Sequence, residues 1–295
     1  LVLSALGELE LRRRQFDTGW DLYEHRFGST GSGRRFPYPR WDGRPLTEGA
    51  LLVHAEQGIG DMMLFASCFA ELRQLSAVVL EAPERLVDLF RRSFPWALVM
   101  PYSGDELPRW LDEVPPIAAT IPAGSLMGLY RRTARDFPAH AGYLVPDPER
   151  VARWRARLAR LGSGPKIGIS WRGGFARTGR TARSIELNEW HDVAAMPGIH
   201  AVSLQYTRDA PAEVDAFNAE HGAHVVHWPD AIEDYEETAA LVTALDLVVT
   251  VCTAAAHLGG ALGRPTWILA PTVASWRYLG DGEDLPWYPA ARVFR

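Results

Sequence analysis

A short apolar run that leads directly into a helix is the feature that most constrains this chain. Residues 247–251 are apolar and mostly β-branched, which is typical of a parallel strand buried on both faces. A helix is predicted over residues 253–262, with Gly263 and Pro265 as its stop signals. The N–H groups and the dipole at the start of such a helix favour an anion such as phosphate.

Four residues at this junction are candidate phosphate ligands. Cys252, Thr253 and Ala254 form the predicted turn, and Thr253 adds a hydroxyl donor. His257 lies one helical turn beyond Thr253, so both side chains can face the same ligand. The alternative is an ordinary buried βα unit whose histidine only packs or caps, because such junctions are common.

Length and composition indicate a globular chain with room for two domains. It has 295 residues, of which 47% are hydrophobic and 23% charged. Its net charge of −5 argues against nucleic-acid binding, which usually needs a basic surface. Cys68 and Cys252 lie far apart in sequence, so we expect neither a metal site nor a disulfide framework. No apolar run reaches the ~20 residues of a membrane span and no signal peptide opens the chain, so we expect a cytoplasmic protein.

The order of the predicted elements indicates an α/β protein. Two short helices are followed by a linker rich in Gly, Arg and Pro, and then by two series of alternating strands and helices. The predicted elements include a helix over 59–75 and strands over 166–170 and 266–269. Two such series predict two doubly wound, Rossmann-like domains that face a cleft. We expect a helical remnant with its linker over 1–45, an N-terminal domain over 46–147 and a C-terminal domain over 148–295.

A glycine-containing loop follows the first predicted strand. Gly58 and Gly60 allow a tight turn and a close approach of the backbone to a ligand. Asp61 then lies near a helix N-terminus, where a carboxylate can accept a proton from an attacking hydroxyl. The same aspartate also suits a helix cap, and Glu56 in the same loop is a rival base.

A basic loop follows the first predicted strand of the second domain. Ser170, Trp171 and Arg172 open the loop, and further arginines follow it, among them Arg183. Arginines suit a pyrophosphate because they make bidentate contacts, although a solvated basic loop has the same composition. Around Gln205, which follows a later strand, backbone groups can contact a nucleobase edge, but simple strand termination explains this pattern equally.

Two further segments have simpler interpretations. Asp234 and Glu237 have the spacing of a capping box at a helix start, with a ribose contact as the alternative. Residues 276–289 are too aromatic for a disordered tail. They predict a segment that folds back across the cleft or seals core surface.

Together these motifs resemble a known family. A Gly-x-Gly-Asp turn, a basic Ser-Trp-x-Gly loop and the strand that enters Cys-Thr-Ala-Ala-Ala-His-Leu-Gly-Gly-Ala-Leu-Gly-x-Pro look like the ADP-heptose:lipopolysaccharide heptosyltransferases of glycosyltransferase family 9. The resemblance covers about residues 40–295. The preceding Gly19-Trp20, Tyr23 and Arg26-Phe27 pattern resembles the last unit of a tetratricopeptide array, as in bacterial glycosyltransferase-like domains fused behind such repeats.

The resemblance implies a glycosyltransferase B fold, with the acceptor in the N-terminal domain and the nucleotide-sugar donor in the C-terminal domain. Asp61 matches the family's proposed catalytic base, and Arg183 falls where the family carries a phosphate-binding lysine. Thr253 and His257 match its diphosphate-contacting turn and helix. The family also implies an inverting transferase without metal or cofactor, in which cationic side chains and a helix dipole stabilise the leaving diphosphate.

One departure from the family keeps other functions open. The heptosyltransferases commonly have Asp-Thr-Gly where this chain has Cys252-Thr253-Ala254. We expect transfer to a glycan or to a protein or peptide, since repeat arrays bind extended chains. The alternatives are a nucleotide-sugar epimerase or hydrolase, and a non-catalytic module that binds a nucleotide-sugar or a peptide on a degenerate fold.

Overall fold

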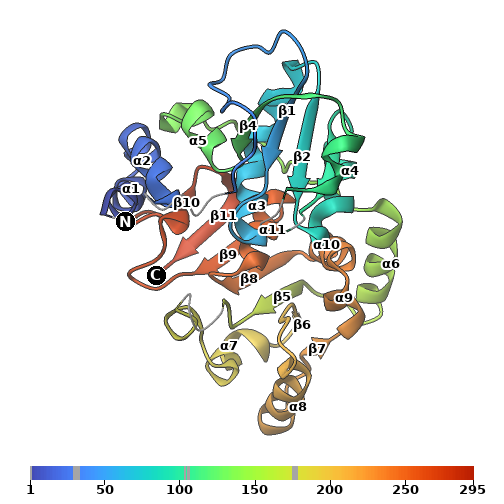
Figure 1. Cartoon of the computed structure of the whole chain (residues 1–295). Coiled ribbons are helices and arrows are strands. Elements are labelled where there is room, and N and C mark those ends of the chain that lie inside the picture. Colours follow the sequence, from blue (N-terminus) through green and yellow to red (C-terminus); the bar gives the residue numbers. More distant parts are fainter. Residues whose placement is uncertain (1, 29–33, 103, 105–106, 175–178) are drawn as a thin grey trace. The chain divides into compact units, whose positions relative to one another are not determined.

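The protein forms two compact units (Figure 1). This computed structural model describes residues 2–28, 34–102, 104, 107–174 and 179–295. The first unit contains Leu1–Ala139 and Ala274–Gly282, and the second contains His140–Val273 and Glu283–Arg295. The chain therefore returns to the first unit for one short segment. The domain boundaries predicted at 45/46 and 147/148 stay predictions, whereas the compact units divide at 139/140.

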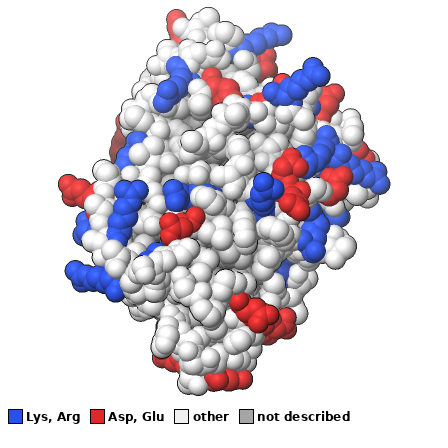
Figure 2. Space-filling model, turned by 180° about the vertical axis from the view of Figure 1, so that it is seen from behind, with Lys and Arg blue, Asp and Glu red and all other residues white. Residues whose placement is uncertain are grey.

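The surface carries both signs of charge. On the face shown in Figure 2, the Lys and Arg side chains are interspersed with Asp and Glu side chains. Within the described part of the chain, no helix combines the length and the apolarity needed to cross a bilayer.

A four-stranded parallel sheet is the centre of the first unit. Its strand order is β3-β2-β1-β4, with every neighbouring pair parallel. The apolar run that forms the first strand is buried along its whole length, as the sequence predicts for an inner strand. The strands are β1 (Ala50–His54), β2 (Val78–Ala82), β3 (Leu98–Pro101) and β4 (Ile117–Pro122).

Along the chain, α-helices and short 3-10 helices precede, separate and follow the strands of this sheet. The α-helices are α1 (Val2–Arg12), α2 (Phe16–Tyr23), α3 (Ile59–Phe65), α4 (Val87–Ser93) and α5 (Ser125–Tyr130). The 3-10 helices are η1 (Glu24–Phe27), η2 (Ala66–Gln74), η3 (Glu84–Leu86), η4 (Arg109–Glu113), η5 (Ala134–Asp136) and η9 (Trp276–Tyr278). The single α-helix expected over residues 59–75 is wrong in its second half, where Ser67, Cys68 and Phe69 have lower helix propensity than the Met and Leu residues at 62–64.

The two N-terminal helices pack tightly as a hairpin, which confirms the helix pair expected there. A Cβ on Gly7 would lie 2.6 Å from the backbone nitrogen of Tyr23, and one on Gly19 would lie 2.7 Å from a methyl carbon of Leu11. Glycine at both positions therefore permits the close approach of α1 and α2. That this hairpin derives from a tetratricopeptide unit remains a prediction.

Trp20 fixes the hairpin to the rest of the first unit. It is fully buried, and its indole N–H donates to the carbonyl of Arg131 at 2.9 Å. Its ring also meets that of Trp276 edge to face, with centroids 5.3 Å apart. Since Trp276 belongs to the returning segment, one aromatic cluster joins sequence positions from both ends of the chain.

A seven-stranded sheet is the centre of the second unit. Its order is β10-β11-β9-β8-β5-β6-β7, and all neighbours are parallel except the β10–β11 pair. The strands are β5 (Lys166–Ser170), β6 (His200–Ser203), β7 (Val226–His227), β8 (Leu247–Val251), β9 (Thr266–Leu269), β10 (Asp284–Leu285) and β11 (Tyr288–Phe294). Strands β5, β8 and β9 have the predicted bounds, and the parallel sheets confirm the α/β class.

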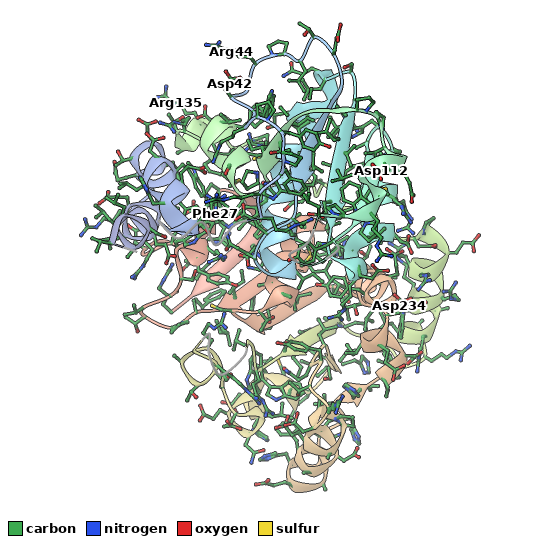
Figure 3. All side chains as sticks on the ribbon, viewed as in Figure 1. Phe27, Asp42, Arg44, Asp112, Arg135 and Asp234 are labelled. Atoms are coloured by element: carbon green, nitrogen blue, oxygen red, sulfur yellow. The ribbon has the colours of Figure 1, made fainter. Side chains whose placement is uncertain are left out.

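The helices of the second unit include the predicted one that follows β8. They are α6 (Pro148–Ala159), α7 (His191–Ala194), α8 (Ala210–His221), α9 (Pro229–Glu233), α10 (Tyr235–Ala244) and α11 (Ala254–Ala261), with 3-10 helices η7 (Thr181–Arg183) and η8 (Leu187–Trp190). Asp234, labelled in Figure 3, caps α10 by accepting from the Glu236 N–H at 2.9 Å. The expected capping box is wrong in its other half, because Glu237 instead accepts from the Trp154 indole at 2.7 Å and from Arg150 at 2.9 Å.

The aromatic tail seals core surface, which is one of the two expected outcomes. Strand β11 extends the second sheet by pairing with β9, and Tyr288 is buried against α11. The sequence did not predict this strand because Pro289 lies inside it, and proline is rare in strands away from a sheet edge.

Replacing Gly260 in α11 tests this packing. A Cβ at this position would lie 2.3 Å from the ring of Tyr288, so we expect Gly260→Ala to destabilise the protein by about 1–3 kcal/mol. In α5, Gly128→Ala is the matched control, because its Cβ would meet only a Trp20 carbon at 3.5 Å. Denaturant unfolding of both variants would show equal stabilities if α11 and β11 did not pack this closely.

Candidate active site

The turn between β1 and α3 holds the aspartate predicted as a base. Gly58 is the N-cap of α3 and Gly60 lies in its first turn. Asp61 is the third helical residue, and its Oδ2 accepts the Gly58 N–H at 3.0 Å. The aspartate therefore does cap the helix, as the simpler interpretation proposed, and its other oxygen remains for a second partner.

That partner is Arg277 of the returning segment. Its Nε donates to Asp61 Oδ1, and its Nη2 donates to the side-chain carbonyl of Gln57 at 2.7 Å. Nη1 donates to the Ser275 hydroxyl at 3.0 Å, and the guanidinium lies 4.6 Å from the centroid of the Trp276 ring. Burial lowers the pKa of Arg277, but the Asp61 carboxylate, together with Tyr23 and Tyr278, raises it above its usual value. The orientation of Asp61 is thus fixed from two sides.

Glu56, the rival base, is a structural carboxylate. Its Oε1 accepts from Arg26 Nη2 and from the Gly124 N–H, both at 2.7 Å, and its Oε2 accepts from Arg26 Nε at 2.8 Å. The Arg26 and Glu56 side chains are only 8% and 6% exposed. Glu56 accepts four hydrogen bonds, the fourth from the Gln57 amide at 3.1 Å, whereas Asp61 accepts one bond on each oxygen and its side chain is 18% exposed. The geometry therefore favours Asp61 over Glu56 as the group able to take a proton.

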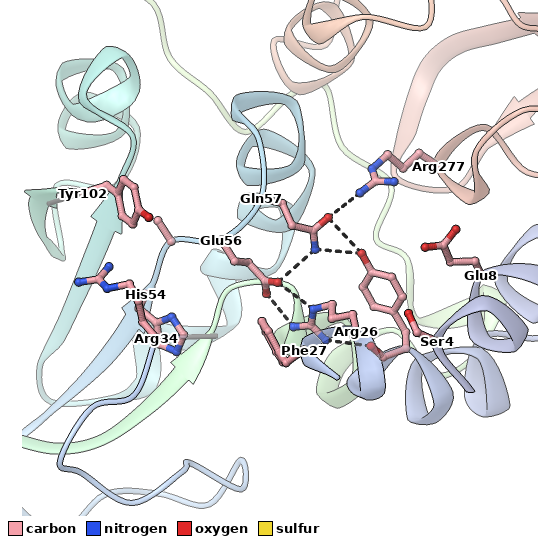
Figure 4. Close-up of a pocket in the computed structure, with 12 residues that line it drawn as sticks. Ser4, Glu8, Arg26, Phe27, Arg34, His54, Glu56, Gln57, Tyr102 and Arg277 are labelled. Atoms are coloured by element: carbon pink, nitrogen blue, oxygen red, sulfur yellow. Dashed lines mark hydrogen bonds and ion pairs between the residues drawn. The ribbon is translucent and has the colours of Figure 1, made fainter. Parts of the chain in front are cut away.

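Arg26, Glu56 and Arg277 border a cavity of about 420 Å³ at the carboxyl end of β1 (Figure 4). Gln57 lies at its centre in the figure and is hydrogen-bonded to Arg277, Tyr23 and Glu56. Ligands of parallel α/β sheets bind at this end of the strands. Further lining residues are Ser4, Glu8, Phe27, Arg34, His54 and Tyr102.

His54 contributes a neutral imidazole to the cavity wall. It is 5% exposed, and burial lowers its pKa from 6.5 to about 4, against an opposing effect of Glu56. Arg34 also disfavours the imidazolium, while Arg34 itself is paired with the fully buried Glu81 at 2.6 Å. The imidazole therefore stays uncharged at neutral pH.

In the second unit, Thr253 occupies the predicted junction of β8 and α11. It is the N-cap of α11, and its hydroxyl accepts from the Ala255 N–H at 3.1 Å and lies 3.1 Å from the Thr250 hydroxyl. Ala254, the first helical residue, is only half-buried. The start of this eight-residue helix therefore retains an accessible side, as a phosphate site requires.

His257 has a different environment from the one expected. Its imidazole is 4% exposed, and Nδ1 lies 3.0 Å from the hydroxyl of Tyr288 in β11. This is the packed arrangement that the alternative interpretation described. Cys252 is also buried at the same junction. The predicted ligand roles of His257 and Cys252 stay predictions.

The loop after β5 is held by Gln205. The side-chain carbonyl of Gln205 accepts from the backbone N–H groups of Trp171 and Arg172 at 3.2 and 3.0 Å, and its amide donates to the Arg172 carbonyl at 2.9 Å. Ser170, Trp171 and Gln205 are all fully buried. The Gln205 side chain therefore orients the loop, so a nucleobase contact would have to come from the backbone there.

Among the described cations of this loop, Arg183 is the one that the structure brings to the α11 junction. Its Nη1 donates to the Cys252 carbonyl at 3.5 Å, and it lines a cavity of about 350 Å³ with Leu269 and Ala270 of the β9 end. Arg172 instead pairs with Asp209 and Glu213. Arg177, another arginine of this loop, lies outside the described residues.

The approach of this loop to α11 depends on Gly173. A Cβ there would lie 2.4 Å from the Thr253 methyl carbon, so only glycine lets the loop contact the helix start. Across the described residues, no group of three or more His, Cys, Asp or Glu side chains is arranged to hold a metal ion. The expected independence from metals and cofactors stays a prediction.

Comparison with known proteins gives the fold but not a family. No family model matches the chain. Protein FlbA of Caulobacter vibrioides is 33% identical over 311 aligned positions, which cover 99% of this chain and 50% of that protein. The chain thus spans about half the length of this curated relative.

Two solved structures share the arrangement of elements. The E. coli ADP-heptose lps heptosyltransferase II has a TM-score of 0.55 at 17% identity, covering 84% of this chain and 90% of its own. A glycosyl transferase family 9 structure from Veillonella parvula has a TM-score of 0.59 at 13% identity, covering 85% and 87%. The chain has the fold of these two transferases. The predicted α/β class with parallel sheets is confirmed.

Sequence reasoning missed the two arginines that organise the first unit. In the sequence, Arg26 and Arg277 were noted only as parts of aromatic motifs. In the structure, the guanidinium of Arg26 lies over the ring of Phe27, which follows it, and that of Arg277 lies over the ring of Trp276, which precedes it. An arginine beside Tyr, Phe or Trp is a weak signal for a buried, stacked cation. Their carboxylate partners could not be inferred from spacing.

Removing the imidazole of His54 should change how stability depends on pH. The unfolded chain binds a proton near pH 6.5 and the folded chain only near pH 4, so folding loses stability as pH falls through this window. The shift corresponds to about 3 kcal/mol by pH 4, and His54→Phe should remove that part of the slope. Denaturant unfolding between pH 7 and 4 measures it. The exposed His191, changed to Asn, is the control, and equal slopes for both variants would contradict a buried neutral His54.

Proposed function

We propose that this chain is an inverting glycosyltransferase that moves a sugar from a nucleotide-diphosphate donor to a glycan or protein acceptor. The observation that carries the proposal is Asp61. It is a half-buried carboxylate held at the carboxyl end of the first strand, in a fold shared with two transferase structures. A carboxylate so placed suits a general base.

The second unit would bind the donor. Its diphosphate would lie at the N-terminus of α11, where the helix dipole and the N–H groups favour negative charge. Arg183 lies at the same junction and would add a charge-assisted contact. Both features would stabilise the charge that develops on the leaving diphosphate, which is where electrostatic catalysis contributes most.

The first unit would supply the base and hold the acceptor. As the acceptor oxygen attacks the anomeric carbon, its proton passes to the Asp61 carboxylate. The bond between the anomeric carbon and the phosphate oxygen breaks, and the diphosphate leaves with the electron pair. Attack from the face opposite the leaving group inverts the anomeric centre. Because Arg277 and the Gly58 N–H fix the carboxylate, little reorganisation would be needed at that moment.

The finer assignments belong to the same proposal. We place the chain among the heptosyltransferase-like glycosyltransferases of family 9, with a glycosyltransferase B layout, a tetratricopeptide-like N-terminal hairpin and a cytoplasmic location. The residues that we propose to bind the nucleotide-sugar are Gly58, Gly60, Ser170, Trp171, Arg172, Arg183, Gln205, Cys252, Thr253, Ala254 and His257. No metal, cofactor or nucleic acid takes part in this scheme.

A second candidate is a binding module that has lost catalysis. The observation in its favour is the turn itself, where buried Cys252 replaces the acid that the heptosyltransferases commonly carry. Such a module would bind a nucleotide-sugar without consuming it. Product analysis with the donor alone and then with an acceptor extract separates it from the transferase and from an epimerase or hydrolase.

Changing Asp61 to Asn tests the base. The amide keeps the size and one acceptor oxygen but cannot take the proton, so we expect transfer to fall by ~10²–10⁴-fold. Nucleotide affinity, measured by calorimetry, should stay unchanged because the proposed diphosphate ligands, Thr253 and Arg183, lie in the second unit. Exposed Asp42, changed to Asn, is the control. Full turnover by Asp61→Asn would show that another group is the base.

Changing Arg183 to Gln tests the donor site. Loss of a charged hydrogen-bond donor should weaken nucleoside-diphosphate binding by ~10–100-fold. The exposed arginine of α6, in Arg153→Gln, controls for a general change of charge. Calorimetry with ADP, UDP and GDP measures both variants, and an unchanged affinity of Arg183→Gln for whichever nucleotide binds would remove Arg183 from the site.

A further inference from the structure

The cavity of the first unit is rich in cations that are already neutralised. Arg26 pairs with Glu56 at 2.7 Å, and Arg34 pairs with Glu81 at 2.6 Å. Arg277 pairs with Asp61. A phosphate group entering this cavity would have to displace a buried carboxylate to gain any of these arginines. Because breaking a buried ion pair is strongly unfavourable, the cavity is a poor anion site in spite of its composition.

The remaining charge in and around the cavity is negative. Glu8 lines the cavity from α1, is exposed, and makes no ion pair with any described residue. Among the described residues, the charged groups that line the cavity and their ion-pair partners are three arginines and five carboxylates: Arg26, Arg34 and Arg277 against Glu8, Glu24, Glu56, Glu81 and Asp61. Arg40, which pairs with Glu24, adds a fourth arginine outside this set. An ammonium group on a ligand would therefore be attracted, and a phosphate or carboxylate repelled.

The uncharged groups of the cavity suit a sugar ring. Tyr102 is 39% exposed and can cover the apolar face of a pyranose, while Arg34 lies 5.1 Å from its ring centroid and restrains it. His54, neutral at physiological pH, and Gln57 offer planar polar groups to hydroxyls. A peptide that binds by strand addition needs an exposed strand edge, and the edge strands β3 and β4 do not line this cavity.

We propose that this cavity binds an uncharged or amine-bearing pyranose, with Glu8 as the residue that selects for the amine. Resting on the proposed function, this sugar is the part of the acceptor that presents its hydroxyl beside Asp61. Arg277 lines the cavity and donates both to that carboxylate and to Gln57, a second lining residue. An acceptor with phosphate on this ring would be excluded.

A matched series of three sugars tests the proposal on the whole chain. Glucosamine, glucose and glucose 6-phosphate share one ring and differ in charge. Their affinities are measured from the chemical shifts of the Gln57 and Gly58 amides, so binding elsewhere does not contribute. We expect glucosamine to bind ~3–10-fold more tightly than glucose, and glucose 6-phosphate to bind most weakly.

Two variants then assign the selectivity. Glu8→Gln should remove the preference for glucosamine and leave glucose binding unchanged. Glu10→Gln on the same helix, outside the cavity and paired with Arg13, should change neither affinity. The proposal is overturned if no sugar perturbs these amides, if glucose 6-phosphate binds best, or if Glu8→Gln keeps the full preference. None of these measurements needs a donor. They test the sugar site independently of glycosyl transfer, which is tested by the assay that compares the unaltered chain with Asp61→Asn.

Discussion

The ion pair between Arg26 and Glu56 is the interaction on which the first unit depends. It joins η1, the loop after β1 and, through the Gly124 N–H, the start of α5. Burying two charges is costly, and the cost is offset only because nearly every hydrogen-bonding position on both groups is filled. Removing either partner would leave a buried charge, so the N-terminal hairpin and the β1–α3 turn are obliged to fold together. The placement of Asp61 follows from that constraint.

Charge is arranged differently in the two units. The first unit surrounds its arginines with carboxylates, which leaves a polar but not anion-binding cavity beside Asp61. In the second unit, Arg183 lies by the Cys252 carbonyl at the start of α11, where the helix itself favours an anion. A phosphate-bearing donor therefore matches the second unit and a hydroxyl-bearing acceptor matches the first. Arg277, carried on the segment that returns to the first unit, fixes the orientation of the Asp61 carboxylate.

The sequence predicted what is local. Strands such as 166–170 and 247–251 were found because a β-branched apolar run needs no distant partner to be recognised. The Asp61–Arg277 contact joins positions 216 residues apart, so no spacing could reveal it. For the same reason Gln205 was taken as a strand end, although its side chain holds the loop at Arg172. The helical period placed His257 one turn beyond Thr253, but it could not reveal that Tyr288 of β11 packs against the imidazole. That strand contains Pro289 and was not predicted.

The central claim is that the second unit binds the anionic diphosphate and the first unit does not. A crystal structure of the chain with an intact nucleotide-diphosphate sugar tests it most directly. The account predicts that diphosphate oxygens lie within hydrogen-bond distance of the Ala254 amide and of Arg183, with the Asp61–Arg277 pair intact. A diphosphate bound instead to Arg26, Arg34 or Arg277 of the first unit would contradict it.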